Sequence, residues 1–126
     1  MRTIVTLMVF LSTATLMAQP TVVTAGLKQN QMSVEAKKGH FQWIFPNGFT
    51  KEKIDQLAKY YTSAFTYRFD AKSNQVDVYA VEDSEETRRI MLRFLGACQF
   101  KTVKVEDKEY LLYEFYDQFM QYNEKE

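Results

Sequence analysis

The order in which two kinds of apolar pattern follow one another is the feature of this sequence that most restricts its fold. Between residues 41 and 105, segments with an apolar residue at every second position alternate with segments whose apolar residues are spaced for one face of a helix. A period of two indicates a half-buried strand, and a period of 3.6 indicates an amphipathic helix. In chain order the segments predict strand, helix, strand, strand, helix, strand.

The four predicted strands are residues 41–45, 65–69, 76–80 and 100–105. The second and third are joined by Asp70-Ala71-Lys72-Ser73-Asn74, whose composition is typical of a tight turn. Upstream, Met32, Val34 and Ala36 also alternate and are followed by Lys37-Lys38-Gly39. This pattern predicts an additional N-terminal strand that forms a hairpin with residues 41–45.

Two predicted helices separate these strands, and each has a recognisable start. Thr50 is a suitable N-cap for the first helix, and Asp83 or Ser84 for the second, which Gly96 would end. The apolar stripe of the first helix consists of Ile54, Leu57, Ala58 and Tyr61. That of the second consists of Ile90, Met91, Phe94 and Leu95.

This order of elements predicts an α+β fold, a ferredoxin-like βαββαβ sandwich in which two helices cover one face of a four-stranded antiparallel sheet. A C-terminal helix from about residue 113 to 122 would extend it, with Phe115 and Phe119 one turn apart. Its aromatic side chains would either pack on the domain's own sheet or form a patch for a protein partner.

The first 18 residues have the pattern of a signal peptide. Arg2 precedes an apolar run from Ile4 to Ala18, which is shorter than the roughly 20 residues of a membrane-spanning helix. Cleavage is expected after Ala18, with Ser12-Thr13-Ala14 as a second choice. We therefore expect an exported protein, periplasmic or extracellular and not inserted in the membrane after cleavage. Residues 19–30 are interpreted as a flexible lead-in and residues 31–126 as a single domain.

Charge and cysteine content exclude several classes of protein. The chain has 16 basic and 16 acidic residues, and removal of Arg2 with the leader would leave a net charge of −1. This balance lacks the basic excess by which proteins bind nucleic acid. Cys98 is the only cysteine, so the chain cannot form an internal disulfide and has to rely on packing. Aromatic residues make up 15% of the sequence and supply material for such a core.

From Gly48 to Val105 the chain resembles the heavy-metal-associated domain, the fold of copper chaperones and of the N-terminal modules of metal-pumping ATPases. Three segments carry the resemblance. Gly48-Phe49-Thr50 is similar to the Gly-Met-Thr that opens the family's metal loop, residues 69–76 to its second strand and hairpin, and Phe94-Leu95-Gly96 to the helix end before its last strand.

The resemblance implies a metal loop at residues 48–54, but the two metal-binding cysteines of the family would fall at Lys51 and Ile54. Copper(I) and zinc require thiolate or imidazole ligands, which neither residue supplies. We therefore interpret this segment as a degenerate metal loop, and we expect no bound cofactor. Its positions are Gly48, Phe49, Thr50, Lys51 and Ile54.

Other candidate binding residues lie in and around this loop. Lys51 and Lys53 are close to the predicted helix N-terminus and could contact an anion or an acidic partner, or they could be solvated first-turn lysines. His40, Met32 and Cys98 are soft donors that could bind a metal, although their spacing matches no known ligand pattern.

The function predicted from the sequence is that of an exported, non-catalytic module that contacts another envelope or extracellular protein. The alternative is a protein that handles copper or zinc through His40, Met32 and Cys98, or that acts on a metal-loaded partner. An enzyme is disfavoured, because a cysteine nucleophile needs a positioned base and the chain has one histidine, with no recognisable catalytic motif around either residue.

Overall fold

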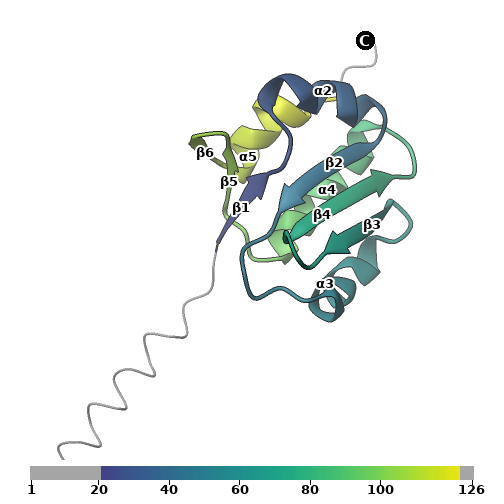
Figure 1. Ribbon diagram of the computed structural model, residues 1–126. Coiled ribbons are helices and arrows are strands. Elements are labelled where there is room, and N and C mark those ends of the chain that lie inside the picture. Colours follow the sequence, from purple (N-terminus) through teal and green to yellow (C-terminus); the bar gives the residue numbers. More distant parts are fainter. Residues whose placement is uncertain (1–20, 123–126) are drawn as a thin grey trace, which may run out of the picture.

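The computed structural model describes residues 21–122 and shows an α+β fold built on one six-stranded mixed sheet (Figure 1). The strand order is β3-β4-β2-β1-β5-β6. The strands are β1 (Val22–Ala25), β2 (His40–Ile44), β3 (Phe65–Asp70), β4 (Gln75–Ala80), β5 (Thr102–Val105) and β6 (Lys108–Leu111). β1 and β5 are parallel, and all other neighbouring strands are antiparallel. The predicted signal peptide lies outside the described residues.

Helical segments connect these strands. The helices are α2 (Gln29–Lys37), α3 (Lys51–Ala58), α4 (Glu85–Ala97) and α5 (Leu112–Phe115), with a 3-10 turn η1 (Lys59–Tyr61) after α3 and a π-helical turn η2 (Tyr116–Met120) after α5. Thr50 caps α3 by accepting a hydrogen bond from the backbone N–H of Lys53, and Ser84 caps α4 through Thr87. None of the helices in the part of the chain that the structure describes is long and apolar enough to cross a membrane.

The predicted strand–helix–strand–strand–helix–strand order is confirmed as β2, α3, β3, β4, α4 and β5, but the four-stranded sheet is not. β1 lies between β2 and β5, which a four-stranded ferredoxin-like sheet would place side by side. The interpretation of residues 19–30 as a flexible lead-in was therefore wrong for Val22–Ala25, the strand β1. Val23 is fully buried and pairs with Val103 of β5. This strand has only four residues before Gly26, so an alternation of apolar and polar residues cannot be recognised in its sequence.

The predicted hairpin of residues 32–45 was also wrong, because residues 29–37 form the helix α2. Met32 and Ala36 are buried, whereas Val34 between them is 53% exposed. Positions i and i+4 share a face in a helix and in a strand alike, so only the middle residue distinguishes the two. Gly39 then adopts a φ of +81°, which favours glycine, and the chain enters β2.

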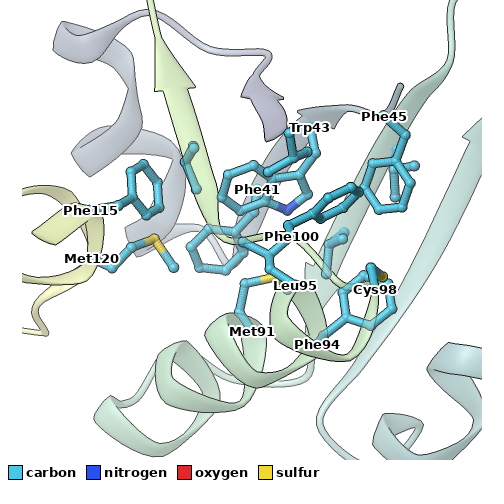
Figure 2. Close-up of a cluster of buried hydrophobic side chains, with 14 of the residues drawn as sticks. Phe41, Trp43, Phe45, Met91, Phe94, Leu95, Cys98, Phe100, Phe115 and Met120 are labelled. Carbon is cyan, nitrogen blue, oxygen red and sulfur yellow. The ribbon is translucent and has the colours of Figure 1, made fainter. Parts of the chain in front are cut away.

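The core lies between the sheet and the helices, on the face that we call the covered face. Figure 2 shows aromatic side chains of β2 above Met91, Phe94 and Leu95 of α4. The Phe94 ring contacts Phe45 and Phe65, with centroids 6.4 and 5.2 Å apart. Figure 1 shows α4 behind the strands, which agrees with this arrangement.

The C-terminal tail packs on the same covered face as α4. The predicted single helix from about 113 to 122 is instead α5 followed by η2, and it covers the chain's own sheet, as one of the two interpretations expected. Phe115 meets Trp43 edge to face, with ring centroids 5.6 Å apart. Arg88 of α4 is 5% exposed, donates two hydrogen bonds to Asp83 and a third to the carbonyl of Gln121, and so holds the tail in place.

Candidate functional site

The other face of the sheet, which we call the open face, carries mostly polar side chains. Side chains alternate between the faces of a strand, so the residues between the buried ones project there. They are Val22, Thr24, His40, Gln42, Ile44, Thr66, Arg68, Asp70, Gln75, Asp77, Tyr79, Thr102, Lys104, Glu109 and Leu111. Each of these is exposed or partly exposed, whereas their neighbours on the covered face include the core of the protein. The open face is therefore the largest polar surface that the described strands share.

One ring on this face joins three elements of the fold. His40 of β2 places Nδ1 2.7 Å from Oε1 of Glu35 in α2 and Nε2 2.8 Å from Oδ1 of Asp77 in β4. A carboxylate only accepts hydrogen bonds, so both ring nitrogens must donate for both contacts to form. Both nitrogens donate only in the imidazolium, the charged form of histidine. We call Glu35, His40 and Asp77 the His40 clamp.

Neighbouring side chains fix the ring and the carboxylate of Asp77. Tyr79 stacks on His40 with ring centroids 5.2 Å apart and planes 10° from parallel. The amides of Gln42 and Gln75 donate to Asp77 at 3.0 and 2.9 Å. The arrangement thus forms a connected polar network around His40 and its two carboxylates.

Gly26 makes room for this network. It follows β1 and donates its backbone N–H to the carbonyl of Gln42 at 2.9 Å. A Cβ atom at position 26 would lie 2.7 Å from the side chain of Gln42, which is closer than such contacts occur. The absence of a side chain at Gly26 therefore lets Gln42 extend over it toward Asp77.

The pKa values of the clamp residues shift in the directions that this geometry requires. Partial burial alone lowers the pKa of His40, but the hydrogen bonds to Glu35 and Asp77 outweigh it and raise the pKa above 6.5. Burial alone raises the pKa of Asp77, yet its hydrogen bonds with Gln75, His40 and Gln42 bring the pKa below 3.8. The hydrogen bond from His40 is the main cause of the lowered pKa of Glu35.

The predicted degenerate metal loop connects β2 to α3, and its residues have structural contacts of their own. Gly48 adopts a φ of +106°, Thr50 is the N-cap, and Phe49 packs against Phe45 with ring centroids 5.0 Å apart. Ile54 is fully buried in the core. Lys51 pairs with Asp55 one turn later, with Nζ 2.9 Å from the carboxylate.

The two lysines proposed as anion or partner contacts differ in their surroundings. Lys51 shares Asp55 with Tyr67, whose hydroxyl donates to the same carboxylate. Burial, followed by this hydrogen bond, raises the pKa of Tyr67. The ammonium of Lys53 lies 4.6 Å from the centroid of the Phe49 ring, a cation–π distance. Both side chains thus have partners within the chain, and whether either also contacts a ligand stays a prediction.

The three candidate metal donors form no common site, although His40 and Met32 line the same small cavity. His40 is on the open face with both nitrogens against carboxylates, whereas Met32 and Cys98 are buried in the core. Burial raises the pKa of the Cys98 thiol to about 12, so it is protonated at neutral pH and a weak nucleophile and ligand. Within residues 21–122 no group of three or more His, Cys, Asp or Glu side chains is arranged to hold a metal ion. His40 and Cys98 likewise form no pair of base and nucleophile.

His40 could be identified as a candidate from the sequence, but its partners Glu35 and Asp77 could not. Asp77 falls within the predicted strand 76–80 and Glu35 within the predicted N-terminal strand, and no motif links either residue to His40. His40 and Asp77 can be placed on the same face of the sheet only when it is known that β2 pairs with β4. In that pairing Gln42 is directly opposite Asp77. Glu35 needed the helical assignment of residues 29–37. The sequence signal that could have found it is composition, because Gln, Met, Glu, Ala and Lys, which are good helix formers, make up most of residues 29–37.

Comparisons with known proteins find no matching family model, no matching curated protein and no matching solved structure. The chemistry of the described residues is therefore the basis for a functional proposal. On the open face, the charged ring of His40 forms two hydrogen bonds with carboxylates and stacks on Tyr79. Amide side chains bind the same carboxylate of Asp77, and Arg68 is opposite Asp77 in the sheet.

Proposed function

We propose that this chain is a non-catalytic protein-interaction module that binds a partner on its open face. The observation that carries the proposal is the organisation of that face, where polar side chains of two adjacent strands, β2 and β4, and of helix α2 are already held by mutual hydrogen bonds. A surface fixed before binding loses less side-chain freedom when a partner arrives. Tyr79, 41% exposed, and the exposed Arg68 are residue types that recur in protein interfaces.

The contacts of the loop at residues 48–54 support a module without the metal cargo of the family that it resembles. Lys51 places an ammonium where that family has a thiolate, and Ile54 places a hydrocarbon in the core at the second position. An ammonium repels a cation and a hydrocarbon donates no electron pair. In this proposal the loop closes the core through Phe49 and leaves recognition to the sheet.

We further propose that the scaffold is an enlarged ferredoxin-like one, exported to the periplasm or the cell exterior, where its partner is another envelope or extracellular protein. With β1 and the edge strand β6 left out, the remaining strands follow the order β3-β4-β2-β5 of that fold. β1 and α2 then constitute an insertion at the N-terminal end, and the insertion supplies Glu35 to the open face.

An affinity experiment with matched variants tests the proposed function. The protein is immobilised and exposed to the envelope fraction of its native cells, captured proteins are identified by mass spectrometry, and the dissociation constant of a purified partner is measured. Arg68→Glu reverses a charge on the open face, whereas Arg93→Glu makes the same change on the exposed side of α4. We expect Arg68→Glu to weaken binding at least tenfold and Arg93→Glu to leave it unchanged.

Two results would contradict this function. If Arg93→Glu weakened binding as much as Arg68→Glu, the partner would contact the helices or respond only to net charge. If a purified partner bound equally well to Arg68→Glu and to a Tyr79→Ala variant, the open face would not be the contact surface. Circular dichroism of each variant checks that the fold is intact.

A further inference from the structure

His40 is the only histidine of the chain, and it links α2 to the sheet through a contact that depends on its charge. We propose that the His40 clamp is a pH-operated latch, closed in mildly acidic solution, which fastens α2 to the open face and releases it when the ring loses a proton. The latch itself follows from geometry within the chain. Its effect on partner binding rests on the proposed function of the open face.

Counting protons on the ring explains why the latch must open. A neutral imidazole has one N–H and one nitrogen with a lone pair. In the clamp each ring nitrogen lies within 2.8 Å of a carboxylate oxygen. After loss of one proton, a lone pair would face a negative oxygen at this distance, and that contact is repulsive. One of the two contacts therefore has to break, while the other can persist.

The contact with Glu35 is the one expected to break. Asp77 has a short side chain on β4 and is held from two further sides by Gln42 and Gln75. Glu35 has a longer side chain on α2, and its other partner, Lys38, is itself 66% exposed. Glu35 can thus rotate into water together with Lys38, whereas Asp77 has little freedom to move. Proton loss then opens the link between α2 and β2 and keeps the link between β2 and β4.

The charged groups around the ring set the direction of the response. Helix α2 contributes Glu35, and Lys38 follows it as the C-cap. Strand β4 contributes Asp77 and the ring of Tyr79, and β3 contributes Arg68, which is opposite Asp77 in the sheet. The two carboxylates outweigh burial and raise the pKa of His40 above 6.5. A group with a raised pKa stabilises the fold fully below its unfolded value, and this contribution is lost as the pH rises through the folded value. The latch is therefore closed at mildly acidic pH and opens as the pH rises through the raised pKa of His40.

Release of α2 would also disturb the packing of the core, because Met32 of α2 is buried there. This residue lines a cavity of about 20 Å³ together with Trp43, Phe115 and Met120. α2 packs on the C-terminal turn at this point, and Figure 1 shows it beside α5 at one end of β1 and β2. We therefore expect the backbone amides of α2 to lose protection from hydrogen exchange when the latch opens, and to lose more of it than the amides of α4. On the open face, the loss of Glu35 from the rim would weaken partner binding.

An NMR titration of the isolated protein tests the latch. The ring protons of His40 give its pKa directly, because no other histidine contributes, and hydrogen exchange of the α2 amides is followed over the same pH range with correction for intrinsic exchange rates. We expect a titration midpoint above 6.5 and, above that midpoint, a loss of the protection of the α2 amides from exchange of about tenfold.

Two variants with the same chemical change complete the test. Glu35→Gln removes the charge that the latch requires, so the His40 midpoint should fall and the α2 exchange should lose its dependence on the midpoint. Glu52→Gln makes the same change on the exposed side of α3 and should behave as the wild type. A midpoint at or below 6.5, or α2 protection that stays constant through the titration, would overturn the latch. Neither outcome involves a partner, so failure of the latch is distinguishable from failure of the proposed binding function.

Discussion

The two faces of the central sheet are built on opposite principles. On the covered face, Phe45, Phe94 and Phe115 are at most 1% exposed and contact other aromatic rings, so this face is held together by the removal of apolar surface from water. On the open face, His40 and Asp77 remain partly exposed and are connected by hydrogen bonds. Burial contributes more free energy per residue than hydrogen bonds that compete with water. The comparison indicates that the covered face supplies stability and leaves the open face available for recognition.

Truncating one aromatic residue on each face provides the strongest test of this difference. Phe94→Ala would remove a fully buried ring that contacts Phe65 at 5.2 Å, and we expect it to destabilise the fold by about 3–5 kcal/mol. Tyr79→Ala on the open face should cost about 1 kcal/mol or less. Urea denaturation followed by the fluorescence of Trp43, the only tryptophan, measures both. Equal losses would show that the open face contributes to stability as much as the core does.

A second comparison concerns ion pairs on α4. Asp83→Ala would leave the buried guanidinium of Arg88 without its carboxylate, and we expect a loss of about 3 kcal/mol. Glu85→Ala removes the partner of Arg89 in a pair that is exposed on both sides and should change the urea midpoint little. Limited proteolysis should release the C-terminal tail sooner in Asp83→Ala, since Arg88 also binds the carbonyl of Gln121. A stable Asp83→Ala variant with a protected tail would contradict this account of the tail.

Acid should weaken the open face through Asp77. Its lowered pKa means that the stabilising contribution is present above 3.8 and is lost as the pH falls through the folded-state value. Asp77→Asn has no such charge to lose. Between about pH 6 and pH 3 the wild type should therefore lose about 1 kcal/mol more stability than this variant, which is the scale of one charge-assisted hydrogen bond in a partly exposed position. Thermal unfolding at a series of pH values measures the difference, and parallel curves for the two proteins would refute it.

The smallest effect is expected at the loop between β2 and α3. Lys51 forms an exposed pair with Asp55, and pairs of this kind contribute little because water screens them. Lys51→Ala should leave the urea midpoint unchanged within experimental error. Thr50→Ala, one residue earlier, removes the N-cap of α3 and should lower stability by about 1 kcal/mol. A larger loss for Lys51→Ala than for Thr50→Ala would mean that the lysine has a structural role that its contacts do not reveal.

Much of the fold could be predicted from local pattern, and the failures share one cause. α4 was predicted from four apolar residues at helical spacing with a cap at Asp83 or Ser84, and it forms there with Ser84 as its cap. α2 was mistaken for a strand because its buried residues, Met32 and Ala36, are only two. β1 was not recognised because four residues give almost no periodicity. Short elements have too little local signal, and their conformation is decided by what they pack against.

The candidate site shows the same limit. His40 was identified because histidine chemistry is visible in the sequence, but its partners come from positions 35 and 77, on elements that only folding brings together. The loop around Lys51 and Ile54 was predicted as a degenerate metal loop because of its resemblance to the loop of a metal-binding family. In the structure Ile54 is part of the core, and Lys51 is paired with Asp55.

The sequence by itself determined the alternation of strands and helices from β2 to β5, the cap of α3, and the aromatic residues that form the core. Periodicity, capping and hydrophobicity act between residues close in the chain, so they can be recognised without the structure. Only the tertiary structure decided that β1 enters the middle of the sheet and that Glu35 and Asp77 meet on one imidazole ring. Sheet order and long-range polar contacts depend on which surfaces remain to be buried after the local elements have formed. Residues that are distant in the chain determine this jointly, so local sequence patterns do not reveal it.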